Sequence, residues 1–404
     1  MLIPKEYEKR DIYPYSSVPR KSYQPDREKD QLFEQRQSLI NRFLQNYIFD
    51  ASKNYLPDIK RVDVQEKGTY QGQLNQFQKK HGRGIFEYKN GDVYYGEWEN
   101  DKFSGKGVYL FNHGERYEGD LLFDNKHGRG AYFYINGDVY LGDWANDKKN
   151  GQGVHIYKPT GEKYEGEWRN GERHGNGIYF FSYGDVYKGQ WENGVKSGHG
   201  LLTYSSGAVY DGEWQNDKAH GEGVMKYYNG DVYEGNWYEG MKHGKGAYTY
   251  NDKTLYQGEW YMDEKNGMGL MKYSNGDEYE GEWIAGEKSG QGKYRYANKD
   301  LYEGEWKSDK RNGEGKLTFA NGDEYAGEWM EGEKNGRGLY KCANGDIYEG
   351  YWAVGMRHGF GRYTWNSGES YSGEWRNDKM EGRGKLLTKE GQEFEGVFKD
   401  DQMI

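Results

Sequence analysis

Cysteine, aliphatic side chains and long apolar runs are scarce in this sequence. Its single cysteine, Cys342, excludes an internal disulfide framework and fits a reducing compartment. No apolar run approaches the roughly 20 residues that cross a bilayer, and the charged N-terminus lacks the apolar region of a signal peptide. We therefore expect a soluble, cytoplasmic protein.

Positive charge is also in the minority. The chain carries 56 Lys and Arg against 66 Asp and Glu, a net charge of -10. General nucleic-acid binding needs a dominant positive field. No nucleic-acid partner is expected.

Glycine and aromatic residues are abundant instead. The sequence has 62 Gly and 41 Tyr, and 17% of its residues are Phe, Trp or Tyr. A chain this poor in aliphatics cannot build a thick aliphatic core, and its polarity alone would suggest disorder. Because each large ring buries about 150–250 Å², rings that recur in register can still stabilise a thin, aromatic-faced sheet.

The aromatics do recur in register. Asn229 to Tyr250 reads NGDVYEGNWYEGMKHGKGAYTY, and its pattern returns every 23 residues apart from two steps of 24. The first aromatic of each of fifteen copies is Tyr70, Tyr94, Tyr117, Tyr140, Tyr164, Tyr187, Tyr210, Tyr233, Tyr256, Tyr279, Tyr302, Tyr325, Tyr348, Tyr371 and Phe394. A fixed period over more than 300 residues indicates a repeat architecture.

Each copy is expected to be a hairpin. The segment Val-Tyr-x-Gly-x-Trp alternates with period two and predicts a strand. A loop of six to nine residues, such as 238–243, is expected next, then a strand over 244–250. Asn-Gly-Asp predicts the tight turn into the following copy. The two copies that lack its glycine, at 251–253 and 298–300, are expected to turn differently.

The pleat predicts an aromatic core. One face of a strand carries Tyr233, Gly235 and Trp237, and one face of the next carries Gly244, Gly246, Tyr248 and Tyr250. The glycines are interpreted as packing residues that make room for neighbouring rings. The predicted repeat core comprises Tyr94, Trp98, Trp144, Trp168, Trp191, Trp214, Tyr233, Gly235, Trp237, Gly244, Gly246, Tyr250, Trp260, Trp283, Trp306 and Trp329.

With its YxGxW strand and HGxG segment, the pattern resembles the MORN repeat (membrane occupation and recognition nexus) over residues 68–404. Some copies depart from it: Leu74 and Leu121 replace Trp, and Phe394 and Phe398 replace the aromatics of the last copy. The resemblance implies an all-β fold, an elongated, twisted single antiparallel sheet over residues 67–404. Thirty strands at about 4.8 Å each predict a rod of roughly 140 Å.

The N-terminal residues lack the period. Residues 1–26 are expected to form an extended arm, 27–50 an amphipathic helix and 51–66 a linker. Leu39, Ile40, Phe43 and Leu44 lie on the apolar face of that helix, whose apolar residues recur at spacings of 3, 4 and 7. Packing on the chain's own repeats, docking on another chain, and disorder all stay open for this segment.

Catalytic motifs are absent from the sequence. The GxG pairs never extend to GxGxxG, and no segment reads GxxxxGK[ST]. Six histidines, including His220 and His243, precede the same glycine in their copies, so stacked copies hold them about 10 Å apart, too far to share a metal. MORN arrays also occur fused to lipid kinases, but residues 1–66 are too few for such a domain. We expect no enzyme, no cofactor and no metal site.

Two surfaces could bind partners. The predicted loops place a cation along one edge, namely Lys102, Lys126, Lys148, Arg173, Lys196, Lys218, Lys242, Lys265, Lys288, Lys310, Lys334, Arg357 and Lys379. This edge is interpreted as a solvated surface or as a site for anionic lipid headgroups or acidic tubulin tails.

The second face of the sheet is apolar in the early copies and polar later. Its apolar residues are Val93, Tyr95, Val108, Leu110, Ala131, Phe133, Val139, Leu141, Val154, Ile156, Ile178 and Phe180. Left open, they would exceed the patch that a soluble monomer usually exposes. We expect the helix of 27–50 or a partner protein to cover them.

These features favour a non-catalytic scaffold whose rod joins other structural proteins. The resemblance implies a setting like that of radial spoke head subunits of cilia or of the cytoskeletal scaffolds of protists, hence a cytoskeletal location in a cilium or axoneme. Self-association is a second hypothesis. A peripheral membrane protein that binds anionic phospholipids through its Lys-bearing loops is a third.

Overall fold

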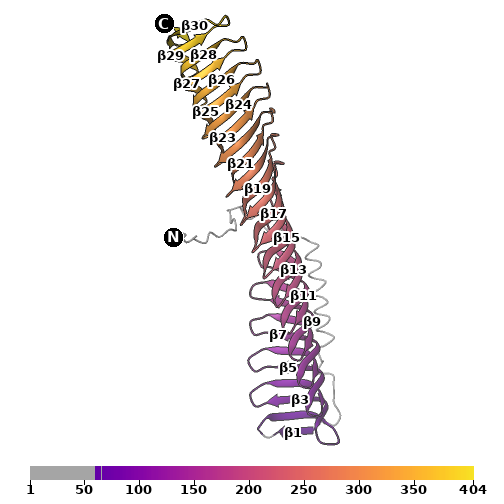
Figure 1. The fold of residues 1–404 in the computed structure, drawn as a ribbon. Helices are drawn as coiled ribbons and strands as arrows, with labels where there is room; N and C mark the ends of the chain where they lie inside the picture. Colours follow the sequence, from indigo (N-terminus) through magenta and orange to yellow (C-terminus); the bar gives the residue numbers. More distant parts are fainter. Residues whose placement is uncertain (1–59, 65) are drawn as a thin grey trace.

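The computed structural model describes residues 60–64 and 66–404, and these residues form one antiparallel sheet of 31 strands (Figure 1). Every strand pairs with the strands before and after it in the chain, and substantial contacts between elements connect chain neighbours only. Such an arrangement extends in one dimension. The molecule is a long rod with β1 at one end and β30 at the other (Figure 1), which confirms the elongated single sheet.

The strands are β1 (Lys60–Val64), β2 (Gly68–Leu74), β3 (Lys80–Tyr88), β4 (Val93–Glu99), β5 (Lys102–Leu110), β6 (Arg116–Leu122), β7 (Asn125–Phe133), β8 (Val139–Ala145), β9 (Lys148–Tyr157), β10 (Glu162–Arg169), β11 (Glu172–Phe180), β12 (Val186–Glu192), β13 (Val195–Thr203), β14 (Val209–Gln215), β15 (Lys218–Lys226), β16 (Val232–Tyr238), β17 (Met241–Thr249), β18 (Leu255–Tyr261), β19 (Glu264–Lys272), β20 (Glu278–Ile284), β21 (Glu287–Arg295), β22 (Leu301–Lys307), β23 (Lys310–Thr318), β24 (Glu324–Met330), β25 (Glu333–Lys341), β26 (Ile347–Ala353), β27 (Met356–Thr364), β28 (Ser370–Arg376), β29 (Lys379–Leu387), β30 (Glu393–Lys399) and β31 (Gln402–Met403).

The array begins earlier than the sequence predicted. Lys60–Val64, assigned above to the linker 51–66, is strand β1, and Val62 lies opposite Tyr70 of β2. Alternating Val62 and Val64 give this segment the apolar period of a strand. The predicted arm, helix and the linker up to residue 59 lie outside the described residues.

The connection inside each hairpin is much shorter than predicted. Between β16 and β17 only Glu239 and Gly240 turn the chain, with φ of 52° and 87°. Positive φ at both central residues defines a type I′ turn, whose twist matches that of the flanking strands. The predicted loop 238–243 is therefore wrong, since 241–243 already belong to β17.

The connection between hairpins is the longer one. Tyr227 to Asp231 link β15 to β16, and Gly230 takes a φ of 92° while its amide donates to the Tyr227 carbonyl at 3.0 Å. Where glycine is missing, Lys253 and Lys299 adopt φ of 75° and 76° and make the same hydrogen bond. The prediction that those two turns differ is wrong: lysine accepts the left-handed backbone there.

Paired glycines, covered by one tyrosine ring, form the centre of each repeat. Gly235 lies directly opposite Gly246, and a Cβ on Gly246 would come within 2.4 Å of the Tyr233 hydroxyl. That hydroxyl donates to the Asn236 carbonyl at 2.9 Å, and Tyr233 has no exposed surface. The ring thus occupies the space that two side chains would fill.

Gly244 does not share this face, contrary to the sequence prediction. The strand pairing shifts between Gly235 and Trp237, and Gly244 has a φ of 64°. A Cβ on Gly244 would meet the Asn236 side chain at 3.3 Å, on the opposite face. The bulge has reversed the alternation. Tyr250 is partly buried against the core.

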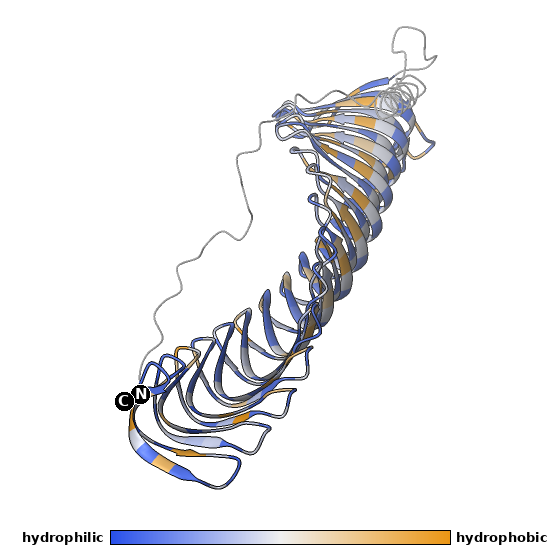
Figure 2. Cartoon of the chain, turned by 90° about the horizontal axis from the view of Figure 1, so that it is seen from above, coloured by the Kyte–Doolittle hydropathy of each residue, from blue (hydrophilic) through white to orange (hydrophobic). Residues whose placement is uncertain are grey.

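Tryptophans join the tyrosines of successive repeats into one stack. Trp237 lies edge-on to Tyr233 at 5.2 Å between ring centroids, and to Tyr210 of the preceding repeat at 5.2 Å. The indole N–H donates to the Gly223 carbonyl at 3.1 Å. The same contacts continue from Tyr117 to Phe398. All predicted core tryptophans, with Tyr94 and Tyr233, are buried. The core is thus one aromatic ladder, while Figure 2 shows that the sheet around it winds along its length.

Candidate functional site

Acidic residues in the longer turns connect neighbouring repeats. Asp231 accepts the Tyr248 hydroxyl at 2.7 Å and the Asn251 amide at 2.8 Å. Burial alone raises the pKa of this carboxyl, but the hydrogen bonds from Tyr248, Asn229 and Asn251 outweigh burial and leave its pKa below the usual value. Asp92, Asp277, Asp323 and Asp346 repeat the arrangement. These turn aspartates therefore link neighbouring repeats.

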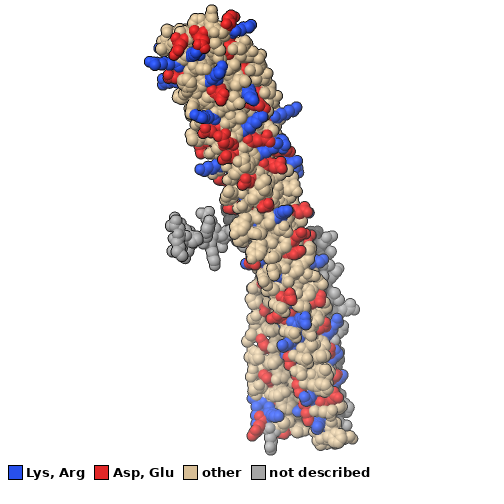
Figure 3. Space-filling model, in the orientation of Figure 1, with Lys and Arg blue, Asp and Glu red and all other residues tan. Residues whose placement is uncertain are grey.

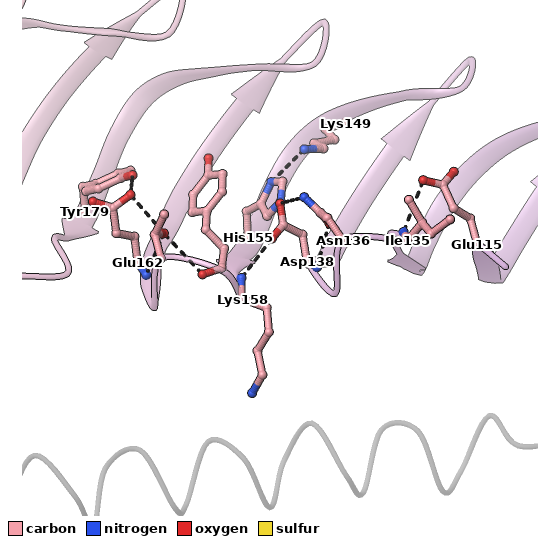
Figure 4. A network of polar contacts seen from close by, with 11 residues as sticks. Glu115, Ile135, Asn136, Asp138, Lys149, His155, Lys158, Glu162 and Tyr179 are labelled. Carbon is pink, nitrogen blue, oxygen red and sulfur yellow. Dashed lines mark hydrogen bonds and ion pairs between the residues drawn. The ribbon is translucent and has the colours of Figure 1, made fainter. Parts of the chain in front are cut away.

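One repeat carries histidine where its neighbours carry tyrosine (Figure 4). His155 occupies the register position of Tyr248, and its Nδ1 lies 2.8 Å from the Lys149 ammonium nitrogen. Its Nε2 lies 3.6 Å from the Asp138 carboxylate. Burial and the Lys149 charge lower the pKa of His155 to about 4, and burial lowers the pKa of Lys149 to about 8. A buried neutral imidazole thus takes the place of a phenol.

The predicted cationic edge divides into two classes. In the first, the side chain lies over a tryptophan of the aromatic face: Lys196 is 4.2 Å from the Trp214 ring centroid and Lys334 is 4.1 Å from that of Trp352. Lys126, Arg173, Lys242, Lys265, Lys288 and Arg357 are placed in the same way. These cations cap the aromatic core and are second residues of their strands, so they are not loop residues.

The second class is exposed but mostly paired with acids. Lys102 lies 3.7 Å from Asp124, Lys379 lies 2.7 Å from Asp400, and Lys218 pairs with Glu239. Figure 3 shows acidic and basic side chains intermingled along the rod, without a large area of one sign on this side. The described residues therefore offer no uncompensated basic edge on the side that Figure 3 displays.

The sheet brings the predicted apolar residues of the second face together. Tyr95 lies opposite Val108, Phe133 opposite Val139, and Val139 in turn opposite Ile156. We call this surface the apolar strip; it comprises Val93, Tyr95, Val108, Leu110, Ala131, Phe133, Val139, Leu141, Val154, Ile156, Ile178 and Phe180. Leu110 is 43% exposed. Leu39, Ile40, Phe43 and Leu44, predicted to pack there, lie outside the described residues.

Beyond the strip, the second face changes character. A hollow of about 1040 Å³ runs from His199 of β13 to Met268 of β19, with the glycine pairs at its floor. Asp211, Glu222 and Glu234 line it. The apolar strip therefore gives way to a polar groove in the middle of the rod.

A second apolar surface went unnoticed in the sequence. The edge formed by the two-residue turns exposes one large apolar side chain in most later repeats, which we call the hairpin-edge row: Tyr238, Tyr261, Ile284, Met330 and Val354. Their exposed fractions lie between 47% and 68%. For Tyr238, Tyr261, Ile284 and Met330 the signal was the residue directly after Trp, which is charged in some earlier copies, as at Glu99 and Arg169. Val354 follows its Trp two residues later, in the turn itself.

No catalytic constellation appears among residues 60–64 and 66–404. They contain no group of three or more His, Cys, Asp or Glu that could hold a metal ion. They also contain no helix suited to crossing a bilayer. The surfaces that remain to explain are the apolar strip, the polar groove and the hairpin-edge row.

The family can now be stated. The model of the MORN repeat matches fourteen segments, at residues 79–93, 94–116, 117–139, 140–159, 164–186, 187–209, 210–232, 233–254, 256–278, 279–301, 302–324, 325–347, 348–370 and 371–392. The chain belongs to the MORN repeat family. These repeats are structural units and are not catalytic, and such an array is suited to protein or membrane interactions.

Similarities to individual proteins are more limited. A segment of 60 residues is 37% identical to an inactive protein tyrosine kinase pTKL of Plasmodium berghei, covering 15% of this chain and 5% of that protein. The TCP10 domain of Danio rerio CPAP aligns with 49% of this chain and 93% of its own at 12% identity, with a TM-score of 0.29. Its complex with a peptide of Danio rerio STIL aligns with 63% of this chain and 96% of its own at 12% identity, with a TM-score of 0.27. At these scores neither structure informs the function of this chain.

Proposed function

We propose that the protein is a non-catalytic scaffold whose stiff rod joins structural proteins of a large cytoskeletal assembly, with a cilium or axoneme as its setting. The aromatic ladder carries this proposal. Because each first tyrosine of a copy from Tyr140 to Tyr348 contacts tryptophans of two repeats, the repeat boundaries between them carry the same edge-on ring contacts as the repeat interiors. At about 4.8 Å per strand the described sheet extends over roughly 140 Å. A rod of this length can hold partners at fixed separations.

The hairpin-edge row is the surface that we assign to such partners. Ile284 is 58% exposed and Met330 is 55% exposed, and the position between them is Lys307. Two strand spacings, about 10 Å, separate successive repeat positions along this edge. Exposed apolar residues that recur along one edge mark an interaction surface better than single scattered ones. A structural partner with its own repeat would gain many equivalent contacts.

Membrane binding is the alternative that the experiment must exclude. It would need cations that are free to meet anionic headgroups. Lys196 and Lys334 instead lie over tryptophan rings, and Lys379 pairs with Asp400. Because these cations are already engaged within the chain, their contacts support the scaffold hypothesis over membrane binding.

Fractionation of cells that express the tagged full chain tests the proposal. We expect the chain to resist detergent and to stay in the cytoskeletal pellet. Ile284→Asp with Met330→Asp should release it several-fold more easily, whereas Gln215→Asp with Lys307→Asp, at the same repeat positions, should not. Release by detergent together with binding to phosphatidylserine vesicles that weakens as salt rises would contradict the proposal, as would an unchanged pellet fraction for the first variant.

A further inference from the structure

The apolar strip has two defined ends. The residues that define it run from β4, with Val93 and Tyr95, to β11, with Ile178 and Phe180, and Ile85 of β3, opposite Tyr95, continues it by one strand. The second face of β14 already carries Asp211 and Glu213. Seven strand spacings separate β4 from β11, which makes the strip about 34 Å long.

Charges inside the strip are compensated locally. Arg116 pairs with Glu118 at 2.8 Å and places its guanidinium over the Phe133 ring at 4.2 Å. Lys163 pairs with Glu165 at 2.9 Å and lies 4.3 Å from the Phe180 ring centroid. The alkyl parts of both cations extend the apolar surface. The strip therefore suits an occupant that is apolar on one side and has no strong net charge.

We infer that the apolar strip is the docking site of residues 27–50 of the same chain, folded as a helix. Twenty-four residues in a helix span about 36 Å at 1.5 Å each, which matches the strip. The segment carries four acids and four bases in all, Glu28, Asp30, Glu34 and Asp50 against Arg27, Lys29, Arg36 and Arg42. Its apolar face is built from Leu32, Phe33, Leu39, Ile40, Phe43, Leu44, Tyr47 and Ile48.

The connection to the array fixes the direction of the helix. Ten residue steps join Asp50 to Lys60, where β1 begins, and they reach at most about 36 Å. From β1 to β4 is about 14 Å, whereas from β1 to β11 is about 48 Å. Asp50 therefore lies at the β4 end of the strip and Arg27 at the β11 end. Tyr47 and Ile48 face Tyr95, and Leu32 and Phe33, about 22 Å further along the helix, face Val154 of β9, which lies about five strand spacings from β4.

The tether also favours this occupant over a separate protein. A short linker holds the helix at an effective concentration in the millimolar range, far above that of most cellular partners. An external helix could occupy the strip only by displacing it. The docking leaves the hairpin-edge row exposed, and the inference does not depend on whether the rod is cytoskeletal.

Cysteine pairs in the full chain test the inference, with Cys342→Ser in every variant. A short bismaleimide should link Ile48→Cys to Tyr95→Cys, and Phe33→Cys to Val154→Cys, within one chain. The mismatched pair Ile48→Cys with Phe180→Cys should stay unlinked. Links between two chains, equal linking of matched and mismatched pairs, or no intramolecular link at all would overturn the proposal.

Hydroxyl-radical footprinting gives a second readout. Phe43→Asp with Leu44→Asp should raise the oxidation of Tyr95 and Phe133 at least threefold and leave Tyr261 unchanged. Asn41→Asp with Gln45→Asp, on the polar face of the same helix, should change none of them. The proposal fails if the first variant labels Tyr95 and Phe133 no more than the unsubstituted chain does.

Discussion

Trp260 lies edge-on against Tyr233 of the preceding repeat, with ring centroids 5.4 Å apart and planes at 82°. Tyr233 makes the same contact with Trp237 of its own repeat at 5.2 Å and 87°. Edge-to-face pairs add about 0.5–1.5 kcal/mol beyond the area they bury. Tyr233 therefore couples two repeats, and removing its ring should loosen the boundary between them as well as its own repeat.

The glycine pair beneath Tyr233 should tolerate no side chain. Gly246→Ala places a Cβ within 2.6 Å of three atoms of the Tyr233 ring and hydroxyl, so the ring must leave its site. We expect a loss of about 2–3 kcal/mol or more in local stability, as for overpacked cores. Hydrogen exchange should show it as lost protection in β16 and β17.

Gly240→Asp is the matched control. Gly240 has a φ of 87°, but nothing lies within 4 Å of a Cβ placed there, and Asp217 and Asp263 occupy the same turn position in neighbouring repeats with φ of 67° and 71°. This variant should keep the protection of both strands within about 0.5 kcal/mol. Equal losses from the two substitutions would show that the Tyr233 packing argument is wrong.

The Asp231–Tyr248 hydrogen bond should couple adjacent repeats. Asp231→Ala and Tyr248→Phe are each expected to cost about 1–2 kcal/mol, and the double variant should cost less than their sum. Because the Asp231 pKa is held below its usual value, the coupling should be full at neutral pH and disappear as the pH falls below about 4. Chemical denaturation of the four proteins at pH 7 and pH 3 measures the cycle.

Additivity of the two substitutions at pH 7 would contradict that account. Asp185 offers a natural comparison, because Leu202 stands at the position that Tyr248 takes opposite Asp231. The Asp185 carboxylate accepts the Ser205 amide at 2.8 Å but has no tyrosine hydroxyl from that position. Asp185→Ala should therefore cost less than Asp231→Ala.

Acid should destabilise the repeat that contains His155. Its pKa falls from 6.5 in the unfolded chain to about 4 in the fold, because burial and Lys149 disfavour the imidazolium. The unfolded chain then binds more protons between these values, so stability is full above about pH 6.5 and falls as the pH drops. The loss approaches about 3 kcal/mol at pH 4.

His155→Tyr should remove this acid sensitivity by restoring the phenol that neighbouring repeats carry. The difference in Tm between the variant and the unsubstituted chain should grow from pH 7 to pH 5. Tyr248→His, the reverse substitution, should introduce acid sensitivity where Tyr248 stood. A pH-independent difference for His155→Tyr would show that His155 is not buried as a neutral group.

The two classes of cation should respond differently to neutralisation. Lys196 lies over Trp214, and burial lowers its pKa, so Lys196→Gln is expected to cost about 1 kcal/mol through lost packing and cation–π contact. Lys218 is exposed and pairs with Glu239, so Lys218→Gln should leave the melting temperature unchanged. Similar melting temperatures for both variants would mean that the tryptophan contacts contribute nothing.

The period predicted the sheet but not where each hairpin turns. Asn-Gly-Asp is a strong turn signal and predicts the tight turn, whereas Glu239-Gly240 carries the type I′ geometry. Glu239 is not a residue type that indicates positive φ, so it does not predict a turn at this position. Other copies do carry a turn signal there, because Asn170-Gly171 and Asn193-Gly194 occupy the same position.

The wrong turn position also made the prediction place the candidate cations in loops, although they belong to strands. A loop position for Lys242 predicts a basic edge. In the structure Lys242 belongs to β17, and its ammonium lies 5.3 Å from the Trp260 ring centroid. The bulge at Gly244 could not be derived from alternation, because it breaks alternation. By contrast, alternation does place Val93, Tyr95 and Val108 on one face, because they lie on regular strand segments where the period of two holds. That this surface binds an occupant stays a prediction.

Small-angle X-ray scattering of the full chain at low concentration tests the rod most directly. A straight rod of roughly 140 Å has a radius of gyration of about 40 Å, and the described sheet predicts a value close to this with a rod-like cross-section. A compact globule with the same number of residues would have a radius of gyration of about 22 Å, and an unfolded chain one of about 70 Å. A radius near either of the latter values would contradict the continuous aromatic ladder on which the proposed scaffold depends.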